Sequence, residues 1–162
     1  MQCDFDIIGT KSVLADAEIL AVINRTLTAL EIPHTIRLNN RRVLNGLLET
    51  VGAREHSAAV LRAIDKLDKL GPEAVAAELT EQAGLNREQI DTVFRFIALS
   101  GRNLPPKELF TELRSTLGQN PLAAEGVTQL EQAIKFAEPL GVAPEIVSID
   151  LSIARGLDYY TG

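Results

Sequence analysis

The feature that most constrains the fold is the long middle stretch, residues 53–142, where apolar residues recur at intervals of three and four and no strand pattern occurs. Glycine and proline divide this stretch into segments, because glycine commonly follows the last helical residue and proline suits the first. The pattern predicts five helices, over residues 55–70, 73–83, 87–100, 105–117 and 122–137. Amphipathic helices bury their apolar faces together, so this stretch should form a helical bundle.

Strand patterns flank the predicted bundle on both sides. Before it, we expect a strand over residues 2–8, a helix over 13–30 capped by Ser12, a short strand over 34–38 and a helix over 41–51. After it, Val147, Ile149, Leu151 and Ile153 alternate with small or polar residues, as in a half-buried strand. The predicted fold class is therefore α+β and helix-rich, with a helical bundle inserted between pieces of a sheet.

The last predicted strand runs into a polar cluster: Arg155, Gly156, Asp158, Tyr159 and Tyr160. Arg155 offers a planar charged fork to a carboxylate or phosphate, and a tyrosine hydroxyl can orient a polar ligand. Two interpretations remain open from the residues alone. The cluster is the lip of a binding pocket, or it is a surface salt bridge beside tyrosines that cover the core. A straight strand would place Arg155 on the face of the apolar residues, so a pocket requires a bend at Gly156 or a change of face before it.

A second candidate site lies at the beginning of the chain. Gln2 and Asp6 share one face of the predicted strand over residues 2–8, opposite Cys3, Phe5 and Ile7. An amide and a carboxylate on one strand face can hold the two ends of a small polar ligand that carries a cation. The alternative is a solvated edge face.

Composition and charge exclude several classes of protein. The formal net charge of −6 over 162 residues argues against strong nucleic-acid binding by the whole surface, because such binding depends on Lys and Arg. The single cysteine, Cys3, cannot form an internal disulfide, and no signal peptide or membrane-spanning run is visible, so we expect a cytoplasmic protein. No metal site is predicted, because His34, His56 and Cys3 are far apart in the sequence.

Three stretches, in order along the chain, resemble one enzyme family. Residues 153–162, Ile-Ala-Arg-Gly-Leu-Asp-Tyr-Tyr-Thr-Gly, resemble the signature peptide of histidyl-tRNA synthetases. Residues 2–9 resemble the strand that closes the second class II motif in this family, and residues 38–46 resemble the strand-to-helix segment that follows it. The resemblance identifies the chain as an internal part of such an enzyme, from the end of motif 2 through the signature peptide.

The resemblance implies a fold and a division into segments. It implies part of the class II antiparallel sheet together with a helical insertion that lies near the acceptor arm of tRNA(His). The expected segments are a catalytic-core segment over 1–52, the insertion over 53–142, and a return strand with the signature peptide over 143–162. The cations to test for RNA contact are Arg54, Arg62, Lys66 and Lys69, and a solvated charged face is the alternative.

The resemblance also implies the chemistry and the roles of five residues. Such an enzyme uses ATP, with Mg²⁺, to convert histidine to histidyl adenylate and then transfers the histidyl group to tRNA(His), usually as a homodimer. By position, Gln2 contacts the histidine, and Asp6 selects it through its imidazole or its amino group. Arg155 lies near the substrate carboxylate and the α-phosphate, where it would offset growing negative charge. Tyr159 and Tyr160 line the histidine pocket, one of them through its hydroxyl.

Motif 1, the ATP-binding arginines of motifs 2 and 3, and the anticodon-binding domain lie outside these residues, so we expect the isolated chain to be inactive. Two other functions remain. One is a non-catalytic synthetase-like protein that regulates histidine biosynthesis or senses uncharged tRNA. The other is a plain helical interaction module. The joint presence of all five pocket residues favours the ligase.

Overall fold

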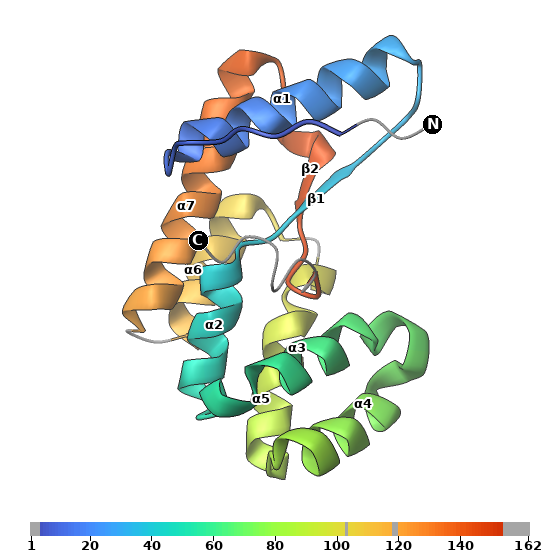
Figure 1. Cartoon of the computed structure of the whole chain (residues 1–162), viewed down its shortest axis with the longest axis vertical. Coiled ribbons are helices and arrows are strands. Elements are labelled where there is room, and N and C mark those ends of the chain that lie inside the picture. The colour runs from blue at the N-terminus through green and yellow to red at the C-terminus, as the bar shows by residue number, and fades with distance from the viewer. Residues whose placement is uncertain (1–3, 103, 118–119, 154–162) are drawn as a thin grey trace. The chain divides into compact units, whose positions relative to one another are not determined.

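The computed structural model describes residues 4–102, 104–117 and 120–153. These residues form mainly α-helices together with one pair of short strands (Figure 1), so the helix-rich α+β prediction is confirmed. The chain divides into two compact units. The first comprises the described parts of Met1–Arg37 and Thr128–Ser148, and the second those of Leu38–Val127 and Ile149–Gly162. The three segments expected from the sequence stay a prediction.

The first unit is built on helix α1, Val13–Ala29. Ser12 caps it as predicted, because its hydroxyl accepts a hydrogen bond from the amide of Leu14 at 3.2 Å. The buried face of the helix consists of Ala17, Leu20 and Ala21. Further along the same face, Asn24 donates from its side-chain amide to the carbonyl of Gly141 at 2.9 Å, which ties α1 to a segment 117 residues away.

The predicted strand over residues 2–8 is wrong where the structure describes it. Residues 4–12 form neither strand nor helix, and all of them are exposed. The carboxylate of Asp6 accepts a hydrogen bond from the amide of Ile7 at 2.8 Å, which occupies a main-chain donor that a sheet would need. The alternating pattern therefore has no partner strand among the described residues, whose two strands pair with each other.

The two strands are β1, Ile36–Leu38, and β2, Val147–Ile149. Both run in the same direction in Figure 1, so this pair is parallel and does not have the antiparallel arrangement expected for the sheet. A parallel pair needs a long crossover connection, and the helices between the strands supply it. The predicted strand over 34–38 is shortened to three residues.

The second unit holds the remaining helices. They are α2 (Arg41–Thr50), α3 (Ser57–Asp65), α4 (Leu67–Ala83), α5 (Arg87–Ala98), α6 (Pro106–Thr116) and the first part of α7 (Pro121–Ala137). The predicted helix over 55–70 is divided at Lys66, and α4 is kinked at Gly71, whose φ of 80° lies outside the helical range. The predicted capping box is present, since Asn86 and Gln89 accept each other's amide hydrogens at 2.8 and 3.0 Å. No helix of the described residues is long and apolar enough to cross a membrane.

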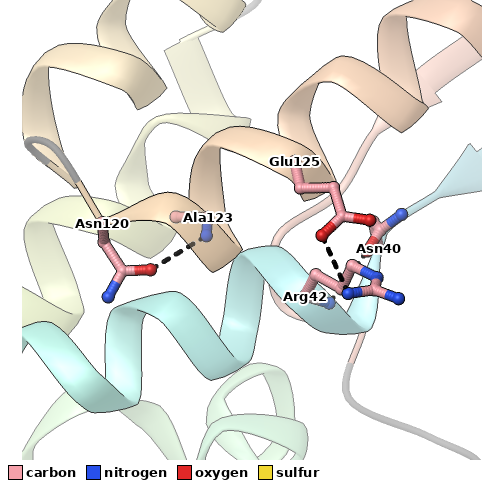
Figure 2. Close-up of polar contacts among 5 residues, drawn as sticks. All are labelled: Asn40, Arg42, Asn120, Ala123 and Glu125. Carbon is pink, nitrogen blue, oxygen red and sulfur yellow. Dashed lines mark hydrogen bonds and ion pairs between the residues drawn. The ribbon is translucent and has the colours of Figure 1, made fainter.

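Helices α2 and α7 cross at very close range in the second unit, because both carry glycine at the crossing. A Cβ atom on Gly46 would lie 2.4 Å from the Cβ of Ala123, and one on Gly126 would lie 2.7 Å from the backbone nitrogen of Val43. Polar contacts flank the crossing (Figure 2): Arg42 pairs with Glu125 at 2.9 Å, and the Asn120 side chain accepts a hydrogen bond from the amide of Ala123. These contacts fix the orientation of α2, which begins directly after β1.

Candidate functional site

The best-defined polar arrangement lies in the turn that follows β2, immediately before the signature residues. The carboxylate of Asp150 accepts hydrogen bonds from the amide of Ser152 at 3.0 Å and from its hydroxyl at 2.6 Å. The amide of Ile153 donates to the carbonyl of Asp150 at 3.2 Å, which closes the turn. Asp150 is only 6% exposed, and these hydrogen bonds compensate for removing its carboxylate from water.

Two side chains from distant segments hold the same turn. The hydroxyl of Ser100 accepts a hydrogen bond from the amide of Leu151 at 2.7 Å. The side-chain amide of Asn39 donates to the carbonyl of Ile153 at 2.9 Å. We call Asn39, Ser100 and Asp150 the turn clamp. All three belong to the second unit, and the side chain of Leu151 between them is fully buried.

The stretch over residues 38–46 explains how Asn39 reaches this place. Leu38 ends β1, and its carbonyl accepts a hydrogen bond from the amide of Asp150 at 2.9 Å, which extends the pairing with β2. Asn40 caps α2 through a hydrogen bond from the amide of Arg42 to its side chain at 2.8 Å. The two asparagines therefore serve different elements. Asn39 bonds the turn, Asn40 caps the start of α2, and Gly46 allows α7 to pack closely against α2.

The turn also changes the predicted pattern of the last strand. Val147 and Ile149 are buried and Ser148 is exposed, as the alternation requires, but Asp150 and Leu151 are both buried. The predicted strand through Ile153 is wrong beyond Ile149, because the hydrogen bonds of the Asp150 carboxylate form a turn there. The condition for a pocket, a bend at Gly156 or a change of face before it, concerns residues outside the described part of the chain and stays a prediction.

Of the five predicted histidine-site residues, the structure describes only Asp6. Asp6 is exposed, and its carboxylate bonds the amide of Ile7. The other four, Gln2, Arg155, Tyr159 and Tyr160, lie outside the described residues, as does Cys3. Their convergence on one pocket stays a prediction. Within residues 4–102, 104–117 and 120–153, no group of three His, Cys, Asp or Glu side chains could hold a metal ion.

Three of the four cations proposed for RNA contact bond to acceptors of their own chain. Arg54 pairs with Glu49 at 3.1 Å, and Lys66 pairs with Glu78 at 2.5 Å. Arg62 donates to the carbonyl of Ala58 at 3.0 Å, and Lys69 is exposed. Neighbouring carboxylates reduce the positive potential around Arg54 and Lys66, so contact with RNA at these positions stays a prediction.

Sequence reasoning missed the turn clamp. The spacing of Asp150 and Ser152 is a recognisable turn signal, because an aspartate often bonds the amide two residues ahead. Asn39 lies within residues 38–46, one of the stretches that resemble the family, but the sequence pattern assigns it no role. Ser100 carries no local signal at all, since its partner lies 51 residues further along the chain.

The family model described as histidyl-tRNA synthetase matches residues 1–162. The chain belongs to the histidyl-tRNA synthetase family. Among curated proteins of the family, the histidine–tRNA ligase of Rhodopirellula baltica is 45% identical over all of this chain, and that of Wolinella succinogenes is 41% identical over 99% of it. The chain spans 36% of the length of each of these two relatives.

Solved structures agree with the family at the level of the fold. The crystal structure of histidyl-tRNA synthetase from Nostoc sp. PCC 7120 matches 94% of the chain with a TM-score of 0.83 at 34% identity, and the match covers 36% of that chain. A structure from Bacillus halodurans, described as an ATP phosphoribosyltransferase regulatory subunit/histidyl-tRNA synthetase, matches 96% of the chain with a TM-score of 0.74. Its match covers 39% of that chain at 19% identity, so this second likeness shows the fold alone.

Proposed function

We propose that this chain is the central segment of a histidine–tRNA ligase, which as a full-length protein activates histidine with ATP and transfers it to tRNA(His). The observation that carries the proposal is the family match over residues 1–162, together with 45% identity to a relative that bears this name. Because the chain spans 36% of that relative, it would supply only part of the active site. Alone, it should not activate histidine.

In this proposal, the two ends of the chain supply the histidine pocket. Gln2 and Asp6 bind the amino-acid substrate, and the exposed carboxylate of Asp6 is accessible to a ligand. Arg155 is the catalytic residue, placed beside the substrate carboxylate and the α-phosphate. Tyr159 and Tyr160 line the pocket. A site that bonds both imidazole nitrogens would reject apolar analogues strongly, because its polar groups would be left unpaired.

ATP and tRNA(His) are the other proposed substrates. In the full-length ligase, Mg²⁺ would accompany ATP, as the resemblance to the family implies. The helices of residues 53–142 would form the insertion of a class II catalytic domain, close to the acceptor arm of the tRNA. We expect the full-length ligase to be a cytoplasmic homodimer.

Histidine-dependent ATP–pyrophosphate exchange by the purified full-length protein tests the proposal. We expect exchange with histidine and none without it. Tyr159→Phe and Tyr160→Phe should each be compared with the wild type, and one of them should raise the KM for histidine because a hydroxyl contact is lost. The chain of 162 residues should show no exchange. A full-length protein that folds but gives no exchange with histidine would refute the proposal.

The alternative is a regulatory protein without ligase activity. The likeness to the Bacillus halodurans structure is compatible with it, although that likeness concerns the fold. A regulator would bind histidine or uncharged tRNA and change the activity of an ATP phosphoribosyltransferase, without supporting pyrophosphate exchange. The same exchange assay, combined with histidine binding by calorimetry, therefore separates the two functions.

A further inference from the structure

We propose that the turn clamp, Asn39, Ser100 and Asp150, positions the signature peptide for histidine binding. The clamp bonds the main chain of Leu151 and Ser152, which precede that peptide, and of Ile153, its first residue, and its three side chains are not among the proposed histidine contacts. The inference rests on the proposed function, because it assigns these residues an effect on the histidine site of the ligase. Asn39, Ser100 and Asp150 are thus positioning residues and not catalytic ones.

The orientation of Asn39 is determined by its partners. Its side-chain oxygen accepts a hydrogen bond from the amide of Asn40 at 2.8 Å, and its side-chain nitrogen donates to the carbonyl of Ile153 at 2.9 Å. A main-chain amide can only donate and a carbonyl can only accept, so reversing the side-chain amide would break both bonds. Asn39 thereby fixes the carbonyl of Ile153, which forms the peptide bond to Ala154, the next residue of the signature peptide.

Ser100 and Asp150 fix the two preceding positions. The amide of Leu151 is bonded by Ser100, and the amide and hydroxyl of Ser152 are bonded by Asp150. The buried side chain of Leu151 already anchors the turn in the core of the second unit. Apolar burial is non-directional, whereas the hydrogen bonds restrict the backbone at three consecutive residues. They therefore set the direction in which the chain leaves the turn.

Direction matters because binding groups must be held within a fraction of an ångström of their productive positions. Arg155 is two residues beyond Ile153, and Tyr159 and Tyr160 follow it. In this proposal, a shift of the Ile153 carbonyl changes the position from which the peptide that carries these groups begins. Loss of one clamp bond should therefore weaken histidine binding more than ATP binding, because Arg155 is the only one of these groups proposed to lie near a phosphate and the other ATP contacts belong to parts of the ligase beyond this chain.

The test uses the full-length ligase with two variants that each remove one clamp hydrogen bond, one variant that restores a hydroxyl, and a matched control. Asn39→Asp keeps the oxygen that accepts from Asn40 and removes the donor to Ile153. Ser100→Ala removes the acceptor for Leu151, and Ser100→Thr restores a hydroxyl. The matched control is Asn24→Asp, because Asn24 also donates from its side chain to a distant carbonyl, that of Gly141, at the same 2.9 Å. Asn24 belongs to the first unit, whereas the three clamp residues belong to the second.

In pyrophosphate exchange, we expect Asn39→Asp and Ser100→Ala to raise the KM for histidine about three- to tenfold, the range of one hydrogen bond. The KM for ATP should stay within about twofold in both variants, as expected for a change confined to histidine binding. Ser100→Thr should restore the wild-type KM for histidine, and Asn24→Asp should not change it. Equal changes in both KM values, or the same change in Asn24→Asp, would overturn the inference.

Failure of the proposed function can be recognised separately. If the wild type shows no ATP–pyrophosphate exchange, the clamp is tested instead by amide hydrogen exchange of the peptide that contains residues 150–153. Asn39→Asp and Ser100→Ala should accelerate amide exchange there about tenfold relative to Asn24→Asp, as expected when a local hydrogen bond is lost. Unchanged amide hydrogen exchange rates at these residues would overturn the inference about the clamp whether or not the protein is a ligase.

Discussion

Substitution of Gly46 by alanine should destabilise the second unit, although alanine is the better helix former. The added Cβ would lie 2.4 Å from the Cβ of Ala123 and 2.8 Å from its Cα and backbone nitrogen. Carbon atoms in contact normally lie about 3.5–4.0 Å apart, so α2 and α7 would have to separate by roughly 1 Å. Two of the three opposing atoms belong to the backbone, and a change of side-chain rotamer cannot relieve the overlap.

The size of the effect follows from two opposing terms. Replacing glycine by alanine inside a helix stabilises it by about 1 kcal/mol. Overpacking a core costs typically 1–3 kcal/mol and occasionally more. Because the overlap at Gly46 involves backbone atoms, we place the cost at the upper end, about 3 kcal/mol. The net loss is then about 2 kcal/mol, which corresponds to a decrease in Tm of roughly 4–8 °C for a chain of this length.

Urea unfolding, followed by circular dichroism, measures this loss. A double-mutant cycle identifies its cause. Gly46→Ala combined with Ala123→Gly should lose at least about 0.5 kcal/mol less than the sum of the single variants, because one of the overlapping atoms is removed. Ala124→Gly is the control, since Ala124 is the exposed neighbour on the same helix and its combination with Gly46→Ala should be additive. A Gly46→Ala variant as stable as the wild type would refute the close crossing.

Substitutions at three further positions test other parts of the fold in the same assay. Leu151→Ala should cost about 2–5 kcal/mol, because it leaves a cavity beneath the turn after β2, and a loss below about 1 kcal/mol would show that this side chain is not buried. Asn86→Ala should cost about 1 kcal/mol through loss of the capping box, whereas Asn86→Asp, which keeps the acceptor, should cost little. Burial raises the pKa of the Asp16 carboxyl, so the folded chain holds this proton more tightly than the unfolded chain and ionisation of Asp16 lowers stability as the pH rises. The stability of Asp16→Asn relative to the wild type should therefore increase as the pH rises from 3 to 7, and a relative decrease over this rise would contradict the direction of the pKa shift, which reflects partial desolvation of an exposed residue.

Most helices could be predicted from the sequence because their signals are local. Ser12 and the Asn86–Gln89 pair fix helix starts through bonds within three residues, and Gly84 ends α4 with a left-handed φ of 64°. The strands were harder, because a strand depends on a partner that the local pattern does not contain. Residues 4–8 alternate as a strand does, yet they pair with no described strand.

The polar contacts around the last turn show the same limit. The Asp150–Ser152 spacing is visible in the sequence, but the roles of Asn39 and Ser100 depend on contacts across 114 and 51 residues. No periodicity or capping rule links residues at such separations. The family resemblance pointed to the stretches that contain Asn39 and the signature peptide, and the hydrogen bonds show what joins them.

The wide separation of Asn39 and Ile153 has a consequence for the order of folding. Bringing together residues 114 positions apart costs about 4 kcal/mol of loop-closure entropy. The two strands offset only part of this cost, because each is three residues long and they form few hydrogen bonds. The intervening helices, with their local contacts, should collapse first and shorten the effective loop. The two strands and the turn would then close last, so on a growing ribosomal chain this region stays open until most of the helices have already docked.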